Sequence, residues 1–418
     1  WWVRVVLPAP EPPLIPHVIV TEGQDTASRA IVSRIWDMTR TAASRAGINP
    51  FYVMEVMRAA ELRLAEGGDV LHLEVGQPST PAPPKVIAEA HRVLDEDLLG
   101  YTTSGGVEPL RRRIAQHYDE WYGVDVDPEA VLITLGATGA FVAVFMAAFD
   151  HGDRVVVPSP GYPCYSNTLR ILGVDVVDLP TTIETRFHPT VEQLEALGPV
   201  DGLILSSPSN PTGTMLEAHD MKTLTDWCRA NDVWFISDEI YHGITYGQSA
   251  PTALKFDPEA IVINSFSKYF SMTGWRLGWV VMPEALRVPL TRINQNATIS
   301  APTLSQMAAV AAFDCHDVAV ANIANYAVNR EILLDGLKAA GIDKVAPADG
   351  AFYIWADVSH LTDDSQALGA QWLDELGVAV AAGIDFDPVN GHRFIRFSFA
   401  GSSEDCTEAM RRLKEWVS

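Results

Sequence analysis

The chain has 418 residues, of which 48% are hydrophobic and 20% are charged. It is too long for one ordinary domain, and its composition is typical of a globular protein with a sizeable core. The formal net charge of −23 argues against a nucleic-acid-binding or membrane-surface function, and it means that local Arg or Lys residues must capture any anionic substrate.

The first segment, residues 1–37, is Pro-rich between residues 7 and 16. Its prolines interrupt the apolar stretch that a signal peptide requires, and they disfavour regular structure. We interpret this segment as an extension of uncertain origin. The longest apolar run, residues 139–149, is too short to cross a membrane and predicts a buried helix.

Seven short apolar runs between residues 128 and 283 predict strands. Most are continuously apolar, which is typical of strands that are buried on both faces of a mainly parallel sheet, with helices above and below. The expected strands are Val131–Thr134, Arg154–Val157, Val174–Asp178, Gly202–Ser206, Val233–Ser237, Ile261–Asn264 and Gly278–Met282. Helices are expected between them, for example at Ala218–Asn231, and one before them from Pro109 to Gly123.

The pattern changes toward the C-terminus. Two strand-like runs, Ala351–Asp357 and Arg393–Phe399, flank a helical stretch. A last helix begins near Ser402, which forms a capping-box pattern with Asp405. The expected fold is therefore α/β: a large domain with a mainly parallel seven-stranded sheet flanked by helices (76–300), and a smaller α/β domain (38–75 with 301–418).

Polar residues follow several of the expected strands, where ligands bind in open α/β sheets. Lys268 lies just beyond Ile261–Asn264, and a lysine there can form an imine with an aldehyde cofactor. A lone lysine would more simply be a solvated surface residue. Here Ser265, Ser267 and Arg276 surround it in sequence, and two hydroxyls with a guanidinium can hold a phosphate.

Other strand ends carry complementary groups. Ala137 and Thr138 open a helix in a small-residue turn, which suits a phosphate but is a weak signal alone. Asp238 can pair with a pyridine nitrogen or cap a helix, and Tyr241 follows it by three residues. Two further positions, Asn210 and Tyr162, can bond to and stack on a cofactor ring.

Arg396 lies inside the apolar strand Arg393–Phe399. Burying a guanidinium without an anionic partner is costly, so the position predicts a carboxylate ligand. A structural salt bridge is the alternative. No histidine or cysteine spacing suggests a metal site. The four isolated cysteines favour a reducing, cytoplasmic location.

From about Ile48 to the C-terminus, the chain resembles class I aminotransferases of the pyridoxal 5′-phosphate (PLP) fold-type I group. Any one of its motifs is common, but all of them in order are specific. They are Gly76-Gln-Pro, Tyr101 to Gly105, Gly136-Ala-Thr, Pro160-Gly-Tyr, Asn210-Pro-Thr-Gly, Asp238-x-x-Tyr241, Ser265-x-Ser-Lys268, Arg276 and Arg396.

The resemblance assigns roles to these residues. It implies that Lys268 holds PLP as a Schiff base and that Asp238 pairs with the ring nitrogen. Asn210 and Tyr241 would bond to the phenolic oxygen, and Tyr162 would stack on the ring. By this resemblance Ala137, Thr138, Ser265 and Arg276 would hold the phosphate, where the local pattern also expects Ser267. Arg396 and Gly76 would hold the substrate carboxylate. Tyr101 resembles the family's tyrosine that reaches the phosphate of a neighbouring subunit, which implies a homodimer with shared active sites.

The expected activity is transfer of an amino group from an L-amino acid to a 2-oxo acid by a ping-pong mechanism. A β-eliminating carbon–sulfur lyase on the same scaffold is the first alternative. A PLP-binding regulator without turnover is the second, and the acidic chain disfavours it. The sequence does not identify the substrate side chain: aspartate, alanine, aromatic and branched-chain donors all stay open.

Overall fold

The computed structural model describes residues 42–417. The chain divides into two compact units, Trp1–Ala46 and Gly47–Ser418. In the first unit the described part contains the short 3₁₀ helix η1 (Ser44–Ala46). The extension expected at residues 1–37 lies outside the described residues, and the fold and site below belong to the second unit.

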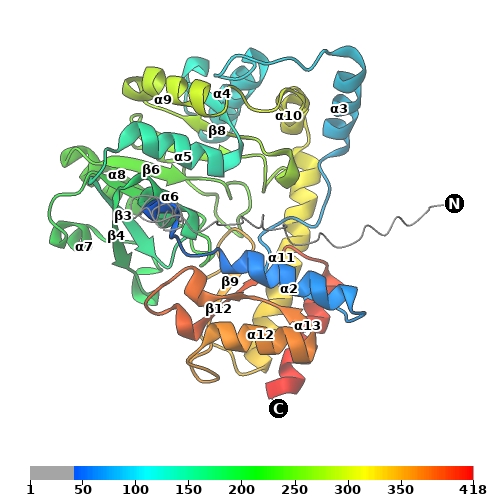
Figure 1. Cartoon of the computed structure of the whole chain (residues 1–418). Coiled ribbons are helices and arrows are strands. Elements are labelled where there is room, and N and C mark those ends of the chain that lie inside the picture. Colours follow the sequence, from blue (N-terminus) through cyan, green and yellow to red (C-terminus); the bar gives the residue numbers. More distant parts are fainter. Residues whose placement is uncertain (1–41, 418) are drawn as a thin grey trace, which may run out of the picture. The chain divides into compact units, whose positions relative to one another are not determined.

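A seven-stranded sheet forms the centre of this unit (Figure 1), as predicted. Its strand order is β2-β8-β7-β6-β5-β3-β4, and only β8 runs antiparallel to its neighbours. All seven expected strands are confirmed, two with the expected ends and five with ends that differ by one or two residues. They are β2 (Val131–Thr134), β3 (Arg154–Ser159), β4 (Asp175–Pro180), β5 (Gly202–Ser206), β6 (Trp234–Asp238), β7 (Ile261–Ser265) and β8 (Gly278–Val281).

Helices cover both faces of the sheet, which explains the continuous apolar runs. In β7, Ile261 and Ile263 join a core cluster with residues of α5, α6 and α9. Val262 points to the other face and joins a cluster with residues of α4 and α8. The helices of this part are α3 (Pro84–Glu96), α4 (Glu108–Tyr122), α5 (Gly136–Ala148), α6 (Pro163–Leu172), α7 (Val191–Ala196), α8 (Ala218–Ala230), α9 (Glu284–Ala297) and α10 (Thr303–Ala309).

A second group of elements contains the three-stranded antiparallel sheet β11-β12-β9 and the two-stranded parallel sheet β1-β10. The two expected C-terminal strands are confirmed as β9 and β12. The strands are β1 (Leu71–His72), β9 (Tyr353–Asp357), β10 (Val378–Ala379), β11 (Ala381–Ala382) and β12 (Phe394–Ser398), and the helices are α2 (Tyr52–Ala65), α11 (His316–Ala339), α12 (Ser365–Leu376) and α13 (Ser403–Val417).

Helix ends follow the expected chemistry. Gly123 ends α4 with φ of 66°, and the Ser402 hydroxyl accepts a hydrogen bond from the Asp405 N–H at 3.0 Å before α13. The division into a large and a small domain stays a prediction, because Gly47–Ser418 forms one compact unit. The short 3₁₀ helices are η2 (Pro128–Ala130), η3 (Ile183–Thr185), η4 (Ala253–Lys255), η5 (Thr273–Trp275), η6 (Val310–Asp314), η7 (Gly383–Asp385) and η8 (Gly391–Arg393).

No single helix in the described part of the chain is long and apolar enough to span a membrane, although the bent pair 303–314 and 316–339 together meets the length and composition required.

Candidate active site

A cavity of about 550 Å³ opens beyond the carboxyl ends of the parallel strands, where β5, β6 and β7 end. Eleven of the thirteen residues predicted from the sequence line it. They are Gly76, Ala137, Thr138, Tyr162, Asn210, Asp238, Tyr241, Ser267, Lys268, Arg276 and Arg396. Segments that are far apart in the chain therefore place their polar groups around one space.

Lys268 lies just after β7 and donates a hydrogen bond from its Nζ to the Gly76 carbonyl. Burial, together with the nearby cations Arg396 and Arg276, lowers the pKa of its amine to about 8, although the charge of Asp238 opposes the shift. The neutral amine, which a nucleophile or a general base requires, is therefore far more populated near neutral pH than in an ordinary lysine.

Asp238 ends β6 with a buried carboxylate. Its Oδ1 accepts a hydrogen bond from the Ile240 N–H at 3.1 Å, and its Oδ2 accepts one from the Tyr165 hydroxyl. Burial raises the pKa of the carboxyl to about 6, although both hydrogen bonds and the charge of Lys268 oppose that rise. A cationic partner in the cavity would offset this cost, so the carboxylate is suited to a protonated ring nitrogen.

Tyr165 is a site residue that the sequence analysis missed. It follows Tyr162 by three residues in the first turn of α6, so the two tyrosines share a helix face. Their rings lie 5.4 Å apart in an edge-on arrangement. The spacing of three residues from Tyr162 could have predicted that Tyr165 lies at the site.

Tyr353 of β9 was missed as well. Its hydroxyl lies 2.7 Å from the hydroxyl of Tyr241, in a buried pair. A Cβ at Gly76 would lie 1.9 Å from the same hydroxyl, so this contact requires glycine at position 76. No sequence pattern links Tyr353 to the site, because it lies on a strand of the second group of elements.

The N-terminus of α5 faces the cavity as an open anion site. Its N-cap residue, Leu135, offers no side-chain hydrogen bond, and its first turn carries no acid. The first N–H groups of a helix have no intrahelical partners, and they attract negative charge. Arg276 lies beside them: a Cβ at Gly136, whose φ is +70°, would come within 2.7 Å of its Nη2. These groups suit a phosphate.

Two predicted residues lie outside the cavity lining. The Ser265 hydroxyl donates to Ser267 Oγ at 2.8 Å or to the Leu277 carbonyl at 2.9 Å, and accepts from the Ser267 N–H. It therefore supports Ser267, which does line the cavity. Tyr101 is 85% exposed and does not reach the cavity of its own chain.

Arg396 also lines the cavity and is only 2% exposed. Its guanidinium lies between the rings of Tyr353 and Phe386, 4.4 Å and 4.6 Å from their centroids. It donates from Nη1 to Asn210 Oδ1 at 2.8 Å and from Nη2 to the Glu74 carbonyl at 2.5 Å. Its Nε has no hydrogen-bond partner within the described residues. Because a buried cation needs an anion, this geometry favours a carboxylate ligand over a structural salt bridge.

An apolar part of the cavity wall was also missed. It contains Phe51, Val53, Met54 and Met57, at the start of α2. Met54 and Met57 are spaced by three residues, which places them on one face of α2, and Phe51 is the residue just before the helix. That spacing equally describes a helix packed on a core, so the sequence alone did not distinguish the two.

These residues fit PLP. The uncapped α5 N-terminus with Arg276 and Ser267 suits its phosphate, the desolvated Lys268 suits its aldehyde, and Asp238 suits its ring nitrogen. Arg396 then has no role toward the cofactor and is left for a substrate carboxylate.

Comparison with known proteins agrees with this geometry. The family model for aminotransferase class I and II matches residues 68–413. The valine–pyruvate aminotransferase of Mycobacterium tuberculosis is 48% identical, over 91% of this chain and 99% of that protein. The (5-formylfuran-3-yl)methyl phosphate transaminase of Methanocaldococcus jannaschii is 32% identical, over 88% of this chain and 96% of that protein.

Among solved structures, that of an aminotransferase from Mycobacterium tuberculosis is similar to this chain, with a TM-score of 0.89 and 48% identity. The match covers 91% of this chain and 99% of that one.

Proposed function

The chain belongs to the class I and II aminotransferases, and from this premise we propose that its amino donor is an L-amino acid with a neutral aliphatic side chain. Its activity is PLP-dependent transfer of an amino group to a 2-oxo acid. The relatives support this activity over β-elimination, and over a regulator without turnover.

PLP supplies an electron-withdrawing ring that makes the α-proton of a bound amino acid removable. The first turn of α5, Arg276 and Ser267 would hold its phosphate. Asp238 would keep a proton on the ring nitrogen, and Asn210 with Tyr241 would bond to the phenolic oxygen. These assignments are supported by the placement of the five side chains and of Ala137 and Thr138, in the first turn of α5, around one cavity.

Lys268 would move the proton. Its amine is desolvated and has a pKa of about 8. It could therefore accept a proton from the α-carbon of the substrate and deliver one to C4′ of the cofactor. Arg396 would orient the substrate by binding its α-carboxylate in the buried position between Tyr353 and Phe386. Donor and acceptor have the same α-carboxylate, so both would use this one site in turn, which is a ping-pong order.

The charges of the side chains that line the cavity support a neutral amino donor. The cations that line the cavity within the described chain are Lys268, Arg276 and Arg396, and each already has a proposed role. In the rest of the lining, Phe51, Val53, Met54 and Met57 form an apolar wall, while Gln77 and Thr273 add only uncharged polar groups. Within this chain's part of the site, a second carboxylate would therefore have no unassigned cation to pair with, which is costly. The related valine–pyruvate aminotransferase supports the same class.

A panel of donors with pyruvate and with 2-oxoglutarate as acceptors tests the substrate class. We expect kcat/KM for valine or alanine to exceed that for aspartate by about 10²-fold, because the aspartate side chain must lose its hydration at an apolar wall. A higher kcat/KM for aspartate than for both neutral donors would overturn the proposal.

We also propose a homodimer in which Tyr101 completes the partner subunit's site. The loop around Tyr101 is held in place, since the Thr303 hydroxyl donates to the Gly100 carbonyl at 2.6 Å and Gln306 Nε2 donates to Thr102 Oγ1 at 3.0 Å. The same loop nevertheless exposes 95% of Leu98 and 85% of Tyr101. Large apolar side chains exposed on a fixed loop are typical of an interface.

Hybrid dimers test the shared site. Tyr101→Ala and Lys268→Ala subunits are each expected to form poorly active homodimers at limiting PLP. A mixed dimer would contain one intact site if Tyr101 acts across the interface, so an equal mixture should recover about one quarter of wild-type activity. A mixture that stays as inactive as its parents, or a wild-type chain that sediments as a monomer, would contradict the shared site.

A further inference from the structure

The first turn of α2 is held by a residue more than 300 positions away. Its N-cap residue, Phe51, offers no side-chain hydrogen bond, so the N–H groups of Tyr52 and Val53 have no partner within the helix. Asp385, in η7, accepts both: Oδ1 from the Tyr52 N–H at 3.2 Å and Oδ2 from the Val53 N–H at 3.1 Å. Its two carboxylate oxygens thus take the place of a local cap.

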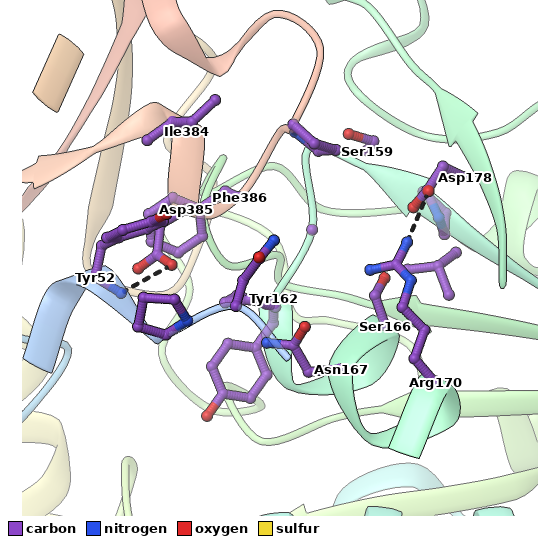
Figure 2. A pocket seen from close by; sticks show the side chains of 17 residues that line it. Tyr52, Ser159, Tyr162, Ser166, Asn167, Arg170, Asp178, Ile384, Asp385 and Phe386 are labelled. Carbon is purple, nitrogen blue, oxygen red and sulfur yellow. Dashed lines mark hydrogen bonds and ion pairs between the residues drawn. The ribbon is translucent and has the colours of Figure 1, made fainter. Parts of the chain in front are cut away.

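Asp385 lines a second, separate pocket, and Figure 2 shows its carboxylate directed at the backbone of Tyr52, across that pocket from the paired side chains of Arg170 and Asp178. Asp385 is only 9% exposed. Burial raises the pKa of its carboxyl to about 6, so that most of it is ionised at neutral pH and can accept both N–H groups. A buried carboxylate at a helix N-terminus is favoured by the helix dipole.

This contact joins α2 to the group that binds the substrate carboxylate. Phe386, the residue after Asp385, stacks on the Arg396 guanidinium, and Ala381 of β11 pairs with Arg396 of β12. Phe51, just before α2, meets the ring of Tyr162 edge-on with centroids 6.0 Å apart. The start of α2 is thus tied both to Arg396 and to the predicted ring-stacking residue.

The held turn presents apolar side chains to the cavity. Val53 is buried in a small cluster with Trp355 and Phe386, which fixes the rotation of the helix. Met54 and Met57 then line the same cavity as Lys268 and Arg396, and Met54 is 55% exposed. Methionine side chains adapt to ligands of different shape.

We infer that Met54 and Met57 contact the side chain of the amino donor and so determine donor specificity. Asp385 is the positioning residue that holds the two methionines against the cavity. The inference rests on the proposed neutral aliphatic donor, and it identifies the side chains that would select that donor. Asp385 itself touches neither the substrate nor the cofactor: it acts through the backbone of α2.

Hydrogen exchange tests the positioning role without any turnover. In the wild-type protein the Tyr52 and Val53 amides should be protected, and Asp385→Ala should accelerate their exchange by at least about fivefold, the effect of losing a helix cap. Asp385→Asn keeps one acceptor oxygen and should restore part of the protection. Unchanged exchange in Asp385→Ala would overturn the role of Asp385.

Asp364→Ala is the matched control. Asp364 also caps a helix, accepting from the N–H groups of Gln366 and Ala367 at 3.1 Å and 3.0 Å, but on α12, which does not line the cavity. It should accelerate exchange at the start of α12 and leave donor preference unchanged. If Asp364→Ala shifted donor preference as much as Asp385→Ala does, Asp385 would only stabilise the fold in general, and the inference would be overturned.

The preference between amino donors tests whether Met54 and Met57 contact the donor side chain. The ratio of kcat/KM for valine to that for alanine should change by about tenfold in Met57→Ala, and in the same direction in Asp385→Ala, mainly through KM. Leu64→Ala, an exposed position on the same helix, should leave the ratio unchanged. If the wild-type protein is active but neither variant alters the ratio, the inference fails and the proposed function stands. If the wild-type protein does not transaminate, the proposed function fails, and exchange still reports on Asp385.

Discussion

Lys268→Ala should lower multiple-turnover transamination by about 10⁴-fold or more, because the variant loses both the covalent anchor and the proton carrier. Lys268→Arg should lose a similar amount: it keeps the positive charge, but a guanidinium stays protonated and cannot act as a base. Initial rates of pyruvate-dependent turnover at saturating PLP measure both losses. Millimolar methylamine should restore part of the activity of Lys268→Ala, since a small amine can enter the space left by the side chain.

Lys255→Ala is the matched control for that variant. Lys255 is exposed at the end of η4 and does not line the cavity. Its replacement should leave turnover within about twofold of wild type, as is usual for surface positions. Wild-type turnover by Lys268→Ala without added amine would refute the assignment of Lys268.

Asp238→Asn should lower kcat by about 10³-fold or more while the protein stays folded. An amide has the shape of the carboxylate and can still accept from the Tyr165 hydroxyl or the Ile240 N–H, but it carries no charge to hold a proton on a ring nitrogen. The loss of a buried charge also removes its desolvation cost, so the thermal midpoint should not fall. Steady-state kinetics and a thermal melt measure the two effects.

Glu239→Gln provides the control for Asp238→Asn. Glu239 is the adjacent residue and is fully buried, but its carboxylate accepts from Thr252, Ala253 and Ser237 and does not line the cavity. Burial raises the pKa of its carboxyl to about 8, so it is mainly neutral at pH 7 and an amide resembles it. Turnover should stay within about threefold of wild type. Equal losses in both variants would contradict a specific role for Asp238.

The large sheet could be predicted because strands that are buried on both faces consist of continuous runs of apolar residues. Each residue of β7 from Ile261 to Ile263 meets one core cluster or the other, so the whole run is apolar. The two-residue strands β1, β10 and β11 contain no such run, because they are too short for a pattern. They were not predicted.

The polar half of the site could be predicted for a related reason. Asp238 ends a strand of the large sheet, and Lys268 and Asn210 each follow one. The carboxyl ends of parallel strands meet at one edge. The second group of elements gives no comparable rule. Tyr353 pairs with Tyr241, and Asp385 with the start of α2, across 112 and more than 300 residues. Such contacts depend on how the elements pack, which local patterns do not encode.

Borohydride reduction of the PLP-loaded protein, followed by peptide mapping, tests the central claim that the cofactor is bound covalently through Lys268. Reduction converts an imine into a stable secondary amine, so the pyridoxyl mass should lie on the peptide that contains Lys268. Other lysine peptides should be unlabelled at stoichiometric PLP. A label on a different lysine, or no label on a protein that remains active, would contradict the account.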